Sequence, residues 1–241
     1  PMVQRLGVEE DQAIEYGLLS KQIENAQKRI ESRNYDIRKN VLQFDDVMNQ
    51  QRNVIYGQRQ EVLEGQNLEQ RMREMRDTLI EEAVKRCVTD ENDRDSWDVD
   101  ALSEYLERIC IKPGGVRALI SGLQSNNRDA LIAKLREESA RFYQEREQML
   151  SEAGIDMREF ERVALLGAVD NRWMDHIDAM DQLRDGIGLR AYGQRDPFVE
   201  YRFEGYEMFD EMIRLIQEDT LRRLYFAVLR QPKLERKQVA H

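Results

Sequence analysis

The chain has few residues that interrupt a helix. Only four prolines and 13 glycines occur among its 241 residues, and Pro113 is the first proline after Pro1. Chains rich in β-hairpins need turn residues more often than this. The scarcity of helix breakers therefore predicts an all-α fold built from long helices.

Membrane spans and disulfide patterns are also missing from the sequence. No apolar run approaches the roughly 18–20 residues that a transmembrane helix needs, and there is no signal-peptide pattern. The two cysteines, Cys87 and Cys110, lack CxxC spacing, which favours buried or half-buried free thiols in a reducing compartment over a disulfide. Because the chain starts at Pro1 without a methionine, we expect a piece of something longer.

The charge balance limits the class of partner. The formal net charge is −10, with 35% charged and 41% hydrophobic residues. This composition is typical of a soluble protein with one or two domains. It argues against bulk nucleic-acid binding, although it leaves room for local basic patches.

One long stretch, from about residue 18 to 62, dominates what is present. It has no proline and one glycine, Gly57. Its length of about 45 residues predicts a helix of roughly 65–70 Å, which spans a domain instead of sitting inside one. Its apolar residues recur at steps of three, four and seven, which places them in one stripe along that helix: Ile23, Ala26, Ile30, Ile37, Val41, Phe44, Met48, Ile55 and Val62.

The stripe has two possible partners. It could form a coiled-coil seam with a second copy of the chain, or it could pack against later helices of the same chain. The steps of four at Ile37–Val41 and Phe44–Met48 fit a globular packing face better than strict heptads. We therefore expect packing within the chain.

Shorter helices follow, and the sequence divides accordingly. We predict a lead-in and a long helix over 1–65, followed by a small helical wing domain over 66–155. A two-helix hairpin over 156–216 comes next, and residues 217–241 form a last helical segment and a charged tail. The small domain carries no metal-ligand cluster, no nucleophile beside a histidine and no glycine-rich phosphate loop.

The hairpin is indicated by two apolar-striped segments around a glycine-containing connection. The first helix is expected from about Met157 to Asp185, and the loop over 186–196 holds three glycines. Asp196 followed by Pro197 is a typical helix start, with Asp as the N-cap and Pro as the first helical residue. Two antiparallel helices joined in this way form an αα-hairpin.

Two sets of residues invite a catalytic or metal interpretation. His176 has Asp175 and Asp178 beside it, which could suggest an acid–base pair. Catalysis would also need a nucleophile and a pocket, and the sequence shows neither. We therefore expect Trp173, which lies in the apolar stripe, in the core and His176 on the helix surface.

Asp45 and Asp46 are the second set. Consecutive helix residues diverge by about 100°, so this pair is better explained by a solvated or interdomain charged face. We predict no catalytic, cofactor-binding or metal-binding residues.

Two segments resemble a known family. SRNYDIRKNVLQFDDVMNQQRNVIYGQR resembles the scaffold helix of SecA, the ATP-driven motor of bacterial preprotein export. WMDHIDAMDQLRDGIGLRAYGQRDPFVEYRFEGYEMF resembles the two-helix finger of the same family, with its tip loop at GLRAYGQRDP. The order of scaffold helix, helical wing and finger also fits, although the resemblance is weak through the wing.

The resemblance implies the C-terminal scaffold, wing and finger region of such a motor without its nucleotide-binding domains. The family's GxxxxGK[ST] loop, its acidic Mg²⁺-binding motif and its cysteine-rich zinc-binding tail do not occur in this sequence. We therefore expect no ATPase activity and no cofactor in this chain. The full-length parent is expected to be a protein-translocating ATPase that uses ATP and Mg²⁺, in the cytoplasm and peripherally at the inner membrane.

The resemblance also implies a contact at the finger tip. In the family, the finger reaches the mouth of the SecY channel and touches the moving preprotein through a tip tyrosine. That tyrosine aligns with Tyr192, flanked by Leu189, Arg190 and Gln194. A tyrosine offers a flat apolar body and one polar end, so it can contact many sequences without selecting one. The alternative is a flexible connection whose tyrosine only packs on its neighbours.

The family's scaffold helix packs against the nucleotide-binding and preprotein-crosslinking domains. Expected partners are these domains, the SecYEG channel and the preprotein, with a second copy as an alternative. The implied role is to couple motor motion to preprotein movement and to restrain ATP turnover; the rival is a purely structural helical scaffold or assembly module. The implied interdomain contacts are Arg33, Asn34, Asp36, Arg38, Lys39, Asp45 and Arg52.

Overall fold

The computed structural model describes residues 17–65, 67–90, 93–123, 127–190 and 196–228. Within these ranges the chain is helical and has no strand, which confirms the all-α prediction. Among the described helices, none has the length and apolar character that a membrane crossing requires. The elements are α1 (Gly17–Leu63), α2 (Leu68–Cys87), η2 (Arg94–Ser96), α3 (Val99–Ile109), α4 (Gly115–Ser121), α5 (Arg128–Glu152), α6 (Met157–Arg190) and α7 (Pro197–Phe226).

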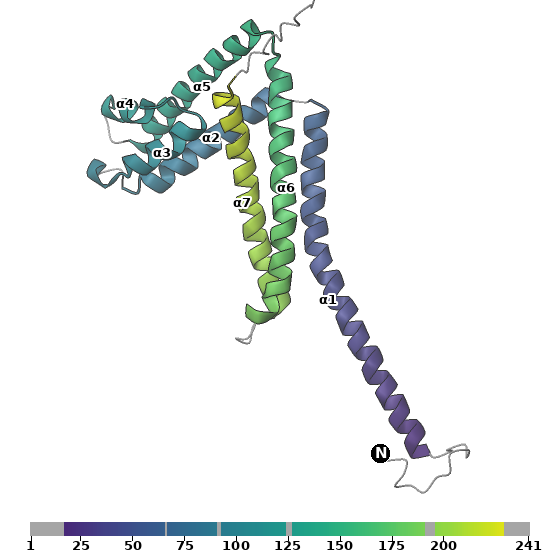
Figure 1. Cartoon of the computed structure of the whole chain (residues 1–241). Helices are drawn as coiled ribbons and strands as arrows, with labels where there is room; N and C mark the ends of the chain where they lie inside the picture. Colours follow the sequence, from purple (N-terminus) through teal and green to yellow (C-terminus); the bar gives the residue numbers. More distant parts are fainter. Residues whose placement is uncertain (1–16, 66, 91–92, 124–126, 191–195, 229–241) are drawn as a thin grey trace, which may run out of the picture.

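Helix α1 is a single 47-residue helix, close to the predicted span. Its second half lies beside α6 and α7, and its first half projects away from the other helices (Figure 1). Ile55 and Val62 are buried in the second half. The expected packing within the chain therefore involves only part of the stripe, because the apolar residues of the first half remain exposed: Ile23, Ile30, Tyr35, Ile37, Val41 and Leu42.

Helices α6 and α7 form the predicted antiparallel hairpin and run side by side (Figure 1). The Asp196 carboxylate accepts a hydrogen bond from the Phe198 backbone N–H at 2.9 Å, as expected for the N-cap. The loop was predicted to begin at residue 186, but α6 continues to Arg190 and includes Gly186. A helical glycine costs only about 1 kcal/mol relative to alanine, and burial of the adjacent Ile187 offsets that cost.

The chain turns sharply between α1 and α2. Gly65 and Asn67 have φ values of +70° and +57°, the left-handed conformation that commonly ends a helix. Helix α2 then leads into a group formed by α2, α3, α4 and α5, which we call the wing. Figure 1 shows the wing to one side of the upper part of the hairpin.

The hydrophobic interior has two parts. The main core joins the wing to the upper hairpin and the end of α1, and includes Leu79, Leu106, Leu135 and Leu224. A smaller group, the tip cluster, lies nearer the α6–α7 connection and has five buried members: Val47, Met180, Leu183, Ile187 and Tyr201. The wing and the end of α1 thus hold one end of the hairpin, and the middle of α1 holds the other.

Candidate functional site: the hairpin and its contact with α1

Two of the four predicted tip residues belong to the part of the chain that the structure describes. Leu189 and Arg190 belong to the last turn of α6. Tyr192 and Gln194 lie outside the described residues. The contact assigned to these four side chains stays a prediction.

Aromatic packing attaches the tip end of the hairpin to α1. The Phe44 ring of α1 meets the rings of Phe198 and Tyr201 of α7 edge-on, with centroids 5.9 and 4.7 Å apart. Edge-to-face pairs at these distances are favourable because the positive ring edge faces the negative ring face. Tyr201 is only 1% exposed. The start of α7 is therefore fixed against α1 close to the tip.

A buried polar link connects α1 to both hairpin helices. His176 Nε2 of α6 lies 2.8 Å from Gln51 Oε1, and Gln51 Nε2 donates to the Gly205 carbonyl of α7 at 2.9 Å. Because the amide nitrogen of Gln51 is used as a donor, its oxygen accepts the proton of His176 Nε2. His176 and Gln51 are 4% and 2% exposed. This link satisfies polar groups that would otherwise be costly to bury.

The position of His176 corrects one prediction. We expected a surface residue, but the ring is buried and lies 5.8 Å from the Phe209 ring and 5.7 Å from Trp173. Burial lowers the pKa of His176 to about 4, so the imidazole is neutral at neutral pH. The prediction that Trp173 is in the core is confirmed. Helical spacing carried the missed signal, because His176 lies three residues after Trp173 and four before Met180.

Gly205 allows α7 to approach its neighbours closely at this link. A Cβ atom at this position would lie 2.7 Å from Cε of Met180. Met180 belongs to the tip cluster and is 1% exposed. The missing side chain thus lets α7 pack closely on Met180 of α6, next to the Gln51 link.

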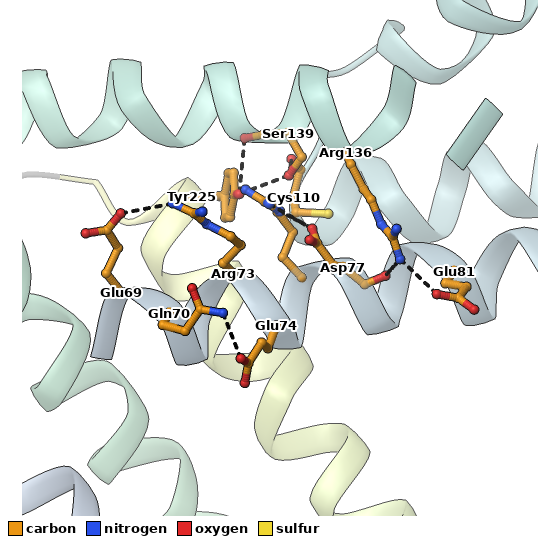
Figure 2. A network of polar contacts seen from close by, with 11 residues as sticks. Glu69, Gln70, Arg73, Glu74, Asp77, Glu81, Cys110, Arg136, Ser139 and Tyr225 are labelled. Carbon is orange, nitrogen blue, oxygen red and sulfur yellow. Dashed lines mark hydrogen bonds and ion pairs between the residues drawn. The ribbon is translucent and has the colours of Figure 1, made fainter. Parts of the chain in front are cut away.

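The wing holds the opposite end of α7. The Arg146 guanidinium of α5 donates to the Ala227 and Leu224 carbonyls at 2.6 and 3.4 Å, which satisfies acceptors at the end of the helix. The hydroxyls of Ser139 and Tyr225 lie 2.9 Å apart. Figure 2 shows these two residues beside Cys110, whose carbonyl accepts from the Ser139 hydroxyl at 2.9 Å.

The cysteines are free and buried, as predicted. Burial raises the pKa of Cys110 to about 12 and also raises the pKa of Cys87. Neither thiol is therefore ionised at neutral pH, and the thiolate is the reactive form. These cysteines serve as small apolar side chains.

The predicted interdomain residues lie on α1, and all seven are exposed. Arg52 donates to Asn49 at 3.0 Å, and Asp46 accepts from Gln50 at 2.8 Å. Among the residues that the structure describes, no group of His, Cys, Asp and Glu side chains is placed to hold a metal ion. The assignment of the seven residues to interdomain contacts stays a prediction.

The exposed half of α1 is basic although the chain is acidic. Residues 20–43 hold six Lys and Arg against three Asp and Glu, whereas the net charge of the whole chain is −10. Among them are the exposed apolar residues Ile30 and Ile37. A surface that combines cations with exposed apolar side chains is suited to binding another protein surface.

Comparisons with known proteins give one consistent result. The family model described as "SecA Wing and Scaffold domain" matches residues 13–227. The chain is 50% identical over 236 residues to protein translocase subunit SecA of Pelotomaculum thermopropionicum, which covers 98% of the chain and 26% of that relative. It is 47% identical over 241 residues to protein translocase subunit SecA 1 of Alkaliphilus metalliredigens, covering 99% and 26%. The chain thus spans about a quarter of the length of these curated relatives.

Proposed function

The chain belongs to the SecA wing and scaffold domain family, and from this premise we propose that it couples an ATP-driven motor to preprotein movement through the SecY channel. In this proposal the hairpin is the finger that contacts the preprotein. The ATP site and Mg²⁺ belong to the nucleotide-binding domains of the full-length parent. The parent would work in the cytoplasm and peripherally at the inner membrane.

One observation carries the proposal: α1 is a single helix whose second half is packed against the hairpin and whose first half is exposed. Its second half contacts both α6 and α7. Its first half is exposed, basic and partly apolar. At about 1.5 Å per residue, its 47 residues extend roughly 70 Å. A single helix attached to motor domains at one end and to the finger at the other would carry movement between them.

Attachment of the finger at both of its ends supports this role. The tip end is held by the aromatic contacts of Phe44, and the other end by the Arg146 cap. The His176–Gln51 link lies between them. A finger held in this way moves with α1, which is what a coupling element needs.

The first experiment places a photo-crosslinking amino acid at Tyr192 of the full-length parent. A preprotein is then stalled during translocation, and the adducts are identified. The proposal expects adducts to the preprotein that require ATP. The control carries the same probe at Tyr206, an exposed α7 position whose hydroxyl donates to Gln50 on α1. Adducts to the channel alone, never to the preprotein, would favour the rival structural scaffold.

The restraint on ATP turnover is tested separately. This chain is added to a parent motor from which the same region has been removed, and binding and ATPase rate are both measured. The proposal expects the rate to fall as the chain binds. Demonstrated binding without any change in rate would remove the regulatory part and leave the finger contact untouched.

A further inference from the structure

A cavity of about 210 Å³ lies where α1, α2, α6 and α7 meet. Helix α1 ends at Leu63, and after the turn through Gly65 and Asn67 helix α2 departs across the hairpin (Figure 1). Helices that cross touch over a short length and then diverge. The divergence leaves space beside the turn that side chains do not fill.

The floor of this cavity is apolar. Five of its six floor residues are less than a tenth exposed, and Ile213 is partly buried. The cavity opens to solvent, and this buried apolar surface favours contact with the apolar part of a ligand. The floor consists of Val62, Met75, Leu165, Val169, Ile213 and Ile216.

The volume sets the size of the apolar body. The volume of 210 Å³ is somewhat larger than the engineered cavity of about 150 Å³ that binds benzene in another protein, so it suits an apolar body of about seven carbons. A linear seven-carbon chain or a small substituted ring meets this limit. A drug-sized molecule or a full-length lipid chain exceeds it.

The rim supplies a cation. Arg71 pairs with Glu61 at 3.1 Å, but the Glu61 side chain is 70% exposed, so the pair is solvent-screened and readily exchanged. The rim acid Glu74 already accepts a hydrogen bond from Gln70 at 2.8 Å. Arg71 is therefore the charged rim residue best placed to bind the anionic group of a ligand, because a guanidinium donates two parallel hydrogen bonds to a carboxylate.

We propose that this cavity binds a small anionic amphiphile: a carboxylate on an apolar body of about seven carbons, with the carboxylate at Arg71. The proposal goes beyond the coupling function and does not depend on it. Because the cavity is lined by α1, α2, α6 and α7, a bound ligand joins the scaffold helix, the first wing helix and both finger helices. Binding would restrain movement of the wing relative to the finger.

Octanoate is the probe, because its seven-carbon tail matches the volume. Calorimetric titration of octanoate into this chain is combined with methyl NMR of the isoleucines. The expected result is saturable binding of one octanoate, with the largest shifts at Ile213 and Ile216. Octan-1-ol, which lacks the charge, should bind more weakly by about 5–10-fold.

Three variants locate the site. Val62→Phe fills the cavity and should abolish binding of both probes. Ile213→Phe, at a partly buried position, is the second cavity-filling variant and replaces the first one if Val62→Phe fails to fold. Arg71→Gln should weaken octanoate by about 5–10-fold and leave octan-1-ol unchanged. The matched control is Arg73→Gln, which removes an exposed arginine that pairs with Glu69 outside the cavity and should change neither.

Two outcomes would overturn the proposal. One is octanoate binding that survives both cavity-filling variants, which would place the ligand elsewhere. The other is the absence of saturable binding and of isoleucine shifts at millimolar octanoate, which would mean that the cavity holds only solvent. Equal binding of octanoate and octan-1-ol would reject the role of Arg71 and keep only an apolar site.

Discussion

His176 Nε2 and Gln51 Oε1 lie 2.8 Å apart in the interface between α6 and α1, at a position where both side chains are almost fully buried. On α1, Gln51 stands between Val47 of the tip cluster and Ile55 of the main core. Sliding α1 by one turn would break this hydrogen bond and leave two polar groups buried without partners. Apolar contacts tolerate such slippage better, so the link specifies the register of the hairpin on α1.

Replacing Gln51 with leucine tests the value of this link. Gln51→Leu keeps the apolar volume, but it leaves the buried His176 Nε2 proton unsatisfied and removes the side-chain hydrogen bond to the Gly205 carbonyl, so we expect a loss of about 2–3 kcal/mol in the free energy of unfolding. Urea denaturation measures it. The control is Gln50→Leu, because Gln50 is exposed and its hydrogen bonds face solvent. Equal losses for the two variants would contradict the structural role of the link.

The buried histidine predicts a dependence of stability on pH. The pKa of His176 is about 4 in the folded chain and about 6.5 when unfolded, so between these values the unfolded state binds the extra proton. Stability from this group is complete above pH 6.5 and is lost as the pH falls towards 4. The expected total loss is about 3 to 3.5 kcal/mol.

The measurement compares urea unfolding of the wild type and His176→Phe from pH 7.5 to 4.5. Other titrating groups affect both proteins equally, so His176 accounts for the difference between their slopes of unfolding free energy against pH. The variant should show a shallower loss on acidification. Parallel curves would mean that the histidine is as accessible to protons in the folded chain as in the unfolded chain.

Two helical glycines should respond in opposite directions to alanine. Gly57 is exposed, and a Cβ atom there would meet nothing within 4 Å, so Gly57→Ala should stabilise the chain by about 0.5–1 kcal/mol. At Gly205 the new Cβ would lie 2.7 Å from Met180 Cε. Displacing this packed side chain should cancel the helix-propensity gain and destabilise by about 1 kcal/mol. Thermal unfolding of both variants measures these effects. An increase in stability for Gly205→Ala would contradict the prediction and show that the Met180 side chain moves aside at little cost.

Local patterns predicted the helices well because their signals lie within one segment. The Asp196–Pro197 start of α7 is an example, since capping depends only on neighbouring residues. The end of α6 was placed too early because Ile187 is buried by contacts with other segments, which a glycine pattern does not report. Tertiary packing decided that boundary.

In the candidate site, too, local features were predicted from the sequence and contacts between distant segments were not. Trp173 was assigned to the core by its place in an apolar stripe, whereas His176 was assigned to the surface by residue type alone. Its partner Gln51 is 125 residues distant in sequence, so a single chain gives no direct sign of the pairing. For the same reason nothing local indicates that Arg146 contacts the end of α7.

The Arg146 contact tests how the wing holds the end of α7. Arg146→Met retains much of the apolar stem but removes donors to the Ala227 and Leu224 carbonyls, so we expect a loss of about 1.5–3 kcal/mol and faster hydrogen exchange in the last turns of α7. Arg141→Met is the matched control on α5, because Arg141 is 65% exposed and pairs with Glu138 of its own helix. If the α7 amides exchange at the same rate in both variants, the wing does not stabilise the end of the finger through this arginine. If only Arg146→Met accelerates exchange there while the amides around Tyr201 keep their protection, the two ends of the hairpin are held independently, as their separate hydrophobic groups imply.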